Sequence, residues 1–225
     1  MKALICLVKK EFLQELRTKE VSVIIVSLSL LLSVLSAIGV QLAFFNLEQV
    51  QKIAPLLIWL SFLFSATAAI GRSFDFEVQY GAIDGLKLAS VSFPLVFLSK
   101  LIVSALILLF SHLISVIALC VLLDLSLSLI SLPFIILSTV VIVAYTALAT
   151  LFSAVAATSR MRGVLLPLIL FPLLFPLFFA ALEVTGDLII RGQASFGSFW
   201  FSFAGLLALV YFLLGLNLYQ FVVEE

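Results

Sequence analysis

The segment Arg72–Pro94, RSFDFEVQYGAIDGLKLASVSFP, is the longest polar interruption in an otherwise apolar chain, and it decides how the chain divides. Apolar side chains recur in it at four-residue spacing, which is typical of an amphipathic helix. They are Phe74, Val78, Ala82 and Leu86, with Ile83 beside them. Gly81 and Gly85 favour two short helical pieces over one long helix. Residues 74–80 also alternate apolar with polar, as a strand does, but a lone strand here would lack a partner, so we predict helix.

Long apolar runs lie on both sides of this segment. The chain has 225 residues, of which 64% are hydrophobic and 11% charged. Uninterrupted apolar runs of about 20 residues indicate membrane-spanning helices, because hydrocarbon forces every backbone polar group to be satisfied within the segment. The formal net charge of zero gives no indication of nucleic-acid binding. We therefore predict an all-α integral membrane protein.

Six spans are expected, joined by short links of polar, Gly or Pro character. They are Val21–Phe45, Ile53–Ile70, Leu95–Leu123, about Leu125 to Ala157, Gly163–Thr185 and Phe196–Val222. The boundary between the third and fourth spans is the least marked, since Asp124 is the only charge in a long apolar tract. Residues 21–222 then form one transmembrane domain, with residues 72–94 as its main loop.

Residues 1–20 precede the first span and predict an amphipathic helix lying in the membrane interface. Its apolar stripe is Leu4, Val8, Phe12 and Leu16, flanked by Ile5 and Leu13. Basic side chains lie to either side of the stripe. Glu15 and Lys19 are spaced to form a favourable pair on one helix face.

The distribution of basic residues predicts the orientation. If the N-terminus is cytoplasmic, ten Lys and Arg residues fall on the cytoplasmic side and two on the other. The ten are Lys2, Lys9, Lys10, Arg17, Lys19, Arg72, Lys87, Lys100, Arg160 and Arg162, and the two are Lys52 and Arg191. Both termini and the 72–94 segment are therefore expected in the cytoplasm, in a bacterial-type inner membrane.

Catalytic and metal-binding signals are sparse. The single histidine, His112, lies inside the third span, where a hydrogen bond to a serine is the ordinary expectation and a haem-ligand or relay role is the alternative. Cys6 and Cys120 are far apart and form no C-x-x-C motif, so no redox pair or metal site is expected. The sequence has no P-loop, so any ATP must be bound by a partner. We predict no catalytic residues and no enzyme activity of this chain's own.

The fifth span, which begins at Gly163, is unusual because it contains Pro167, Pro172 and Pro176. Each proline removes a backbone donor and favours a kink. A kinked helix that packs on protein or lines a pathway fits this pattern, as does a stiff bent helix without substrate contact. Three charged residues follow at four-residue spacing: Glu183, Asp187 and Arg191. They predict a short helix at the outer surface, with an Asp187–Arg191 pair.

These features together resemble the ABC-2 type exporter permeases and, within them, the cytochrome c maturation protein B family, also called haem exporter protein B. The first matching motif comprises Arg72, Phe74, Asp75, Glu77, Gly81, Ile83, Asp84, Leu86 and Leu88. A second comprises Gly163, Val164, Leu165, Leu166, Pro172 and Pro176, and a third is the run Ile53–Trp59 at the start of span two. Tyr80 departs from the family pattern, in which an acidic residue is usual.

The resemblance implies a permease subunit that couples a separate ATP-binding cassette ATPase to release of a haem-loaded chaperone. Its other expected partners are a haem-handling membrane protein, a small single-span helper and membrane lipid. The expected ATPase-docking residues are Arg72, Phe74, Asp75, Glu77, Val78, Gly81, Ile83, Asp84 and Leu86. Haem is expected as a transported or partner-bound ligand and not as a resident cofactor. Since Trp59 and Trp200 are the only tryptophans, a mechanical role is favoured over a haem receptor.

Two other functions are compatible with the residues alone. One is an ABC-2 permease that exports lipid, drug or glycan. The other is an ATP-independent channel or secondary transporter, which would be expected to show paired broken helices in two halves. No convincing internal repeat of that kind is found in the sequence.

Overall fold

The computed structural model describes residues 2–79, 92–156, 162–192 and 196–224, and every regular element in these residues is helical. The elements are α1 (Lys2–Thr18), α2 (Glu20–Leu42), α3 (Leu47–Gln79), α5 (Phe93–Leu122), the 3-10 helix η1 (Leu127–Leu129), α6 (Leu132–Ala156), α7 (Arg162–Arg191) and α8 (Phe199–Glu224). Six of the described helices are long and apolar enough to cross a membrane. The predicted fold class and number of spans are therefore confirmed.

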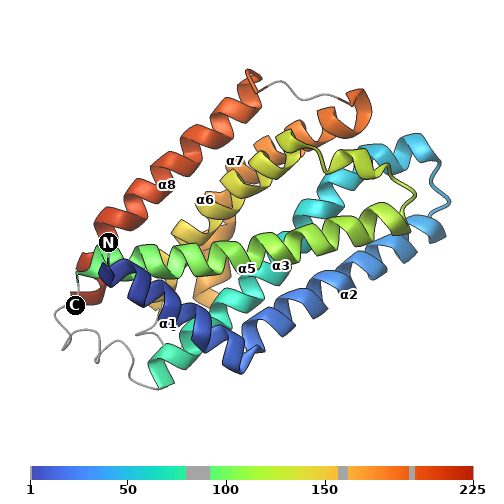
Figure 1. The fold of residues 1–225 in the computed structure, drawn as a ribbon. Coiled ribbons are helices and arrows are strands. Elements are labelled where there is room, and N and C mark those ends of the chain that lie inside the picture. The colour runs from blue at the N-terminus through green and yellow to red at the C-terminus, as the bar shows by residue number, and fades with distance from the viewer. Residues whose placement is uncertain (1, 80–91, 157–161, 193–195, 225) are drawn as a thin grey trace.

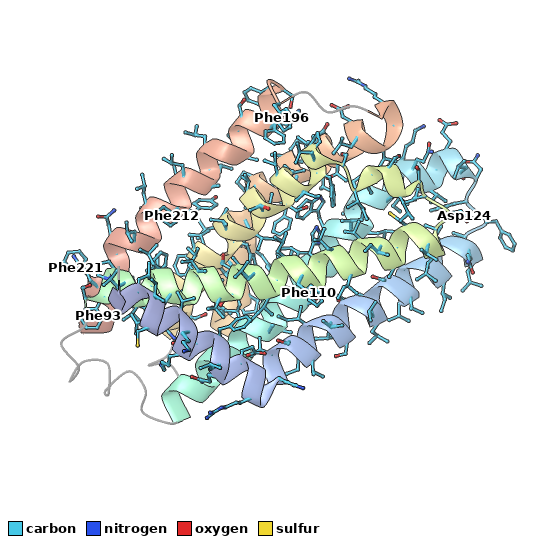
Figure 2. All side chains as sticks on the ribbon, viewed as in Figure 1. Phe93, Phe110, Asp124, Phe196, Phe212 and Phe221 are labelled. Carbon is cyan, nitrogen blue, oxygen red and sulfur yellow. The ribbon has the colours of Figure 1, made fainter. Side chains whose placement is uncertain are left out.

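The helices form an elongated bundle in which both chain termini lie at one end (Figure 1). We call this the termini end. Figure 2 shows Phe93 and Phe221 there, whereas Asp124 lies at the opposite end, which we call the far end. An even number of spans returns the chain to the side on which it started, so the two termini share one face of the membrane.

The middle of the bundle is built around α6, which is the most enclosed of the six spans. It packs against α5, α7 and α8. The helices α2 and α8 are the least enclosed, and many of their large apolar side chains are exposed on the surface of the protein. In a membrane those side chains face lipid, so their exposure carries no cost there.

Two helices continue past their predicted ends. The helix α3 runs to Gln79, and α7 runs to Arg191 without a break. Val184 and Leu188 are buried on the core-facing side of α7, so its apolar face continues past the predicted end at Thr185. The predicted separate surface helix is therefore wrong, because its charged residues occupy the last turns of α7. The predicted ion pair within it is confirmed, with 3.4 Å between Arg191 Nε and Asp187 Oδ1.

The turn between α5 and α6 falls at the predicted place. Asp124 is exposed and adopts a left-handed backbone conformation with φ 53°, which Asp tolerates better than most residues. The Ser126 hydroxyl accepts a hydrogen bond from the backbone N–H of Ser128 at 3.3 Å, at the start of η1. Pro133 lies in the first turn of α6, where its missing N–H has no intrahelical partner to lose.

The junction of α1 and α2 is closed by a carboxylate. Lys19 lies between the two helices with φ 56°. Oε1 of Glu15 accepts hydrogen bonds from the backbone N–H of Ser22 at 2.7 Å and from its hydroxyl at 2.6 Å. This bond satisfies a donor at the start of α2 that has no partner within the helix. It replaces the predicted pair of Glu15 with Lys19.

The predicted apolar stripe on α1 is divided between two surroundings. Leu4 and Val8 are partly buried, and Leu7 beside them packs against the core on the side of α1 that contacts α5. Phe12 is exposed, and the side chain of Leu16 lies outside the described part of the structure. The stripe therefore does not form a single lipid-facing side, because half of it packs against protein.

Candidate functional site

The predicted coupling segment begins as a direct continuation of α3. Five of its expected docking residues lie in the last turns of this helix: Arg72, Phe74, Asp75, Glu77 and Val78. Their backbone is helical, which confirms helix over strand for this part, and the first of the two expected short helical pieces is the end of α3 itself. The other four, Gly81, Ile83, Asp84 and Leu86, lie outside the described residues.

The segment returns to the bundle at the start of α5. Ser92 has extended backbone dihedrals as the residue that caps α5, and Pro94 lies in its first turn. Proline is well suited to this position, because its fixed φ is helical and its missing N–H is not needed. The described residues at the two ends of the coupling segment therefore belong to, or lead straight into, the spanning helices α3 and α5.

The first turns of α5 are locked against α8 at the termini end. Phe97 is fully buried, and its ring centroid lies 5.5 Å from that of Tyr219 on α8. A Cβ added to Gly215 would lie 2.4 Å from Cζ of Phe97 and 3.3 Å from the carbonyl oxygen of Ala147 on α6. The absent side chain at Gly215 thus makes room for the Phe97 ring, and it lets α5, α6 and α8 approach closely.

An ion pair joins the same part of α5 to α1. Nζ of Lys100 lies 3.8 Å from Oε1 of Glu11, and the two side chains are only 7% and 14% exposed. The same carboxylate oxygen lies 3.2 Å from Nζ of Lys10, whose side chain is 47% exposed. From the sequence, Lys100 was predicted only to be one of the basic residues on the cytoplasmic side, and its contact with Glu11 was not predicted.

The predicted kinked helix is α7, which contains all three of its prolines. Gly163 lies in the first turn of α7, and Pro167, Pro172 and Pro176 lie inside it. Pro172 is exposed and the other two prolines are partly buried, so the three do not share one environment. The Tyr211 hydroxyl on α8 donates a hydrogen bond of 2.6 Å to the carbonyl of Leu173, one turn before Leu177. This bond ties α8 to the proline-containing part of α7.

The third family-like motif, Ile53–Trp59, packs α3 against α7. Pro55 is buried, and its Cγ would lie 3.8 Å from a Cβ placed on Gly186, so the two helices are in close contact there. The indole Nε1 of Trp59 donates a hydrogen bond of 3.0 Å to Oγ1 of Thr185, and both side chains are buried. The motif therefore positions α7 relative to the helix that carries the coupling segment.

His112 packs among aromatic rings and makes no hydrogen bond to a serine among the described residues. Its ring stacks with Trp59 at 5.0 Å and with Phe134 at 6.0 Å, and it meets Phe62 edge-on at 5.2 Å between centroids. Neither ring nitrogen has a hydrogen-bond partner among the described residues, so the expected serine bond is wrong. The surrounding rings contribute packing from α3 and α6 and bring no further metal ligand to the imidazole.

Serine pairs connect α2 with α5 and were not identified from the sequence. The hydroxyl oxygens of Ser29 and Ser111 are 3.4 Å apart, and those of Ser33 and Ser115 are 2.9 Å apart. Small hydroxyl residues allow close helix approach in membranes and bond across the contact. The signal was the four-residue spacing of serines within each of the two spans.

The main features of the described residues are contacts between helices. No three His, Cys, Asp or Glu side chains gather as a possible metal site in that part of the chain. The contacts described above instead join the first turns of α5, which follow the coupling segment, to α1 and α8. Such an arrangement is suited to transmitting a displacement between helices.

Comparison with known proteins identifies the family of the chain. No curated protein matches the sequence. The family model described as CcmB protein, however, matches residues 2–220. The matched residues include the coupling segment, the Ile53–Trp59 motif and the proline-containing helix. Proteins of this family are multi-span membrane proteins of haem export in cytochrome c biogenesis, and they are permease subunits. Over nearly its whole length, this chain belongs to the CcmB family.

Proposed function

We propose that this chain is the permease subunit through which a separate ATP-binding cassette ATPase acts on haem delivery during cytochrome c maturation. ATP hydrolysis on that partner drives release of a haem-loaded chaperone, with a haem-handling membrane protein and a small single-span helper in the same complex. Family membership supports this role. The lack of a P-loop in the sequence requires that the energy enter through a protein contact.

The observation that carries the proposal is the way in which the coupling segment joins the bundle. The helix α3 runs without a break from Leu47 to Gln79, into the coupling segment, and α5 begins at Phe93, at the other end of that segment. Helices are stiff along their axes, so a displacement at the segment moves the ends of α3 and α5 together. Because Phe97 is fully buried and packs on Gly215 and Tyr219 of α8, that displacement also reaches α8.

Within the segment, apolar side chains serve as the anchors of the ATPase contact. They are Phe74, Val78, Ile83 and Leu86, and the acidic residues Asp75, Glu77 and Asp84 surround them in the sequence. A few apolar anchors commonly carry most of an interface's free energy, and truncation of one costs about 1–3 kcal/mol or more. Rim charges act mainly on the association rate and its salt dependence.

The test is copurification of the ATPase with variants of the membrane subunit. Phe74→Ala and Leu86→Ala each weaken recovery of the ATPase by about tenfold or more, which corresponds to about 1.4 kcal/mol or more. Lys87→Ala, a control in the same segment, retains recovery within about threefold. Membrane abundance of each variant is measured in parallel. Undiminished ATPase recovery with the Phe74→Ala, Leu86→Ala double variant would exclude the docking role.

Charge reversal provides an independent arm of the same experiment. Glu77→Lys or Asp84→Lys places a cation where the partner is expected to present basic residues, and like charges brought together cost several kcal/mol, roughly. We expect loss of assembly that is partly relieved at high salt, because salt screens the repulsion. A loss that does not depend on salt would show that these carboxylates do not act through charge.

The orientation belongs to the same proposal. Both termini, the coupling segment and the termini end of the bundle face the cytoplasm of a bacterial-type inner membrane. The asymmetry of ten basic residues against two supports this orientation.

A further inference from the structure

The side of α1 that packs on the bundle carries two carboxylates, which is unusual for the buried side of an amphipathic helix. Glu15 is accounted for by its two hydrogen bonds to Ser22 at the start of α2. Glu11 instead contacts two lysines, the neighbouring Lys10 at 3.2 Å and Lys100 on α5 at 3.8 Å. It lies among Leu4, Leu7 and Val8 on this side, and its carboxylate is directed to Lys100 on α5. A charge placed against a local pattern commonly marks a functional or strained position.

Both members of this contact are withdrawn from solvent. The side chains of Lys100 and Glu11 are 7% and 14% exposed, and Lys100 lies within an apolar span. Burial of a charge is costly unless it is paired, so removal of Lys100 leaves the partly buried Glu11 carboxylate with the exposed Lys10 as its remaining ion pair. Lys10, which contacts the same carboxylate, is well exposed, so its ion pair contributes little.

The pair lies close to the exit of the coupling segment. Lys100 is one helical turn after Phe97, the residue that fills the space at Gly215, and two turns after Phe93, where α5 begins. On its other side, α1 exposes Ile5 and Phe12, apolar residues suited to the membrane interface. The ion pair therefore connects a helix held at the membrane surface with the first two turns of α5.

We propose that Glu11 and Lys100 are a positioning pair that fixes α5 to the interfacial helix α1, so that force applied to the coupling segment changes the tilt of α5 relative to the membrane surface. This inference rests on the proposed function, because it assumes that a partner ATPase acts on that segment. Without the pair, α1 still packs on α5, but the charged contact that fixes their relative position is lost. ATP is then hydrolysed with little productive movement of the bundle.

The experiment compares four variants in the assembled complex, with the amount of cytochrome c matured per ATP hydrolysed as the readout. The neutral double variant Glu11→Gln, Lys100→Met removes both charges of this pair, so it accumulates normally and retains the ATPase. Because α5 is then no longer fixed to α1 by the pair, its yield per ATP falls by about tenfold, which corresponds to a loss of coupling of about 1.4 kcal/mol. The reversed pair Glu11→Lys, Lys100→Glu restores the yield to within about threefold of the parent.

The control is Lys10→Gln, which removes the exposed neighbour of the same carboxylate and leaves the yield unchanged. The single variant Lys100→Met, in which the exposed Lys10 is the remaining ion pair of Glu11, is less stable and less coupled than the neutral double variant. A full yield per ATP in the neutral double variant, or no rescue by the reversed pair, would overturn the positioning role. Failure of the docking proposal would be seen separately, as unchanged ATPase recovery with the Phe74→Ala, Leu86→Ala variant.

Discussion

The close approach of α8 to α5 at Gly215 leads to a quantitative prediction for Gly215→Ala. A Cβ at this position would lie 2.4 Å and 2.8 Å from two ring carbons of Phe97, well inside van der Waals contact. The Phe97 ring is fully buried, so it has no open space into which to move. Overpacking of this kind costs about 1–3 kcal/mol. Alanine in place of glycine inside a helix returns about 0.5–1 kcal/mol, so the net loss is about 0–2.5 kcal/mol.

A matched control lies on the same helix. A Cβ added at Gly205 meets nothing within 4 Å, so Gly205→Ala gains helix propensity without a clash. The propensity terms cancel between the two variants, and the difference in unfolding free energy is the clash alone, about 1–3 kcal/mol. Unfolding of both variants is measured in the same detergent by denaturant titration. Equal stabilities for the two variants would refute the packing of Phe97 against Gly215.

Two further predictions concern topology and the proline-containing helix. Reporters that are active only in the cytoplasm should be active at the C-terminus and at Gly85 and inactive at Asn46, whereas an active fusion at Asn46 would contradict the orientation. The Pro172→Ala, Pro176→Ala double variant should restore backbone donors and straighten α7, which lowers cytochrome c yield at normal membrane abundance; parental yield would leave the prolines with no role in coupling.

The sequence predicted the spans because a spanning helix is specified locally. Apolar runs and their polar interruptions located all six, and Asp124 marked the turn that divides the longest run. The amphipathic pattern after Arg72 correctly predicted helix as far as Gln79. Helix ends were harder to predict, since burial of Val184 and Leu188 continues α7 past the end that hydropathy suggested.

Contacts between distant helices could not be predicted in the same way. Glu11 and Lys100 are separated by 89 positions, and nothing local marks either as the partner of the other. The space at Gly215 depends on the position of Phe97 on another helix, so no periodicity reveals it. His112 was expected to bond a serine because polar groups in membranes usually do, but aromatic packing from α3 and α6 surrounds it instead.

The central claim is that this chain transmits work from an ATPase to haem delivery. The most direct test uses proteoliposomes that contain the ATPase and the haem-handling protein, with or without this chain, and measures ATP-dependent release of the haem-loaded chaperone. The account predicts release only when the chain is present, and loss of release with the Phe74→Ala, Leu86→Ala variant. Equal ATP-dependent release in the absence of this chain would contradict it.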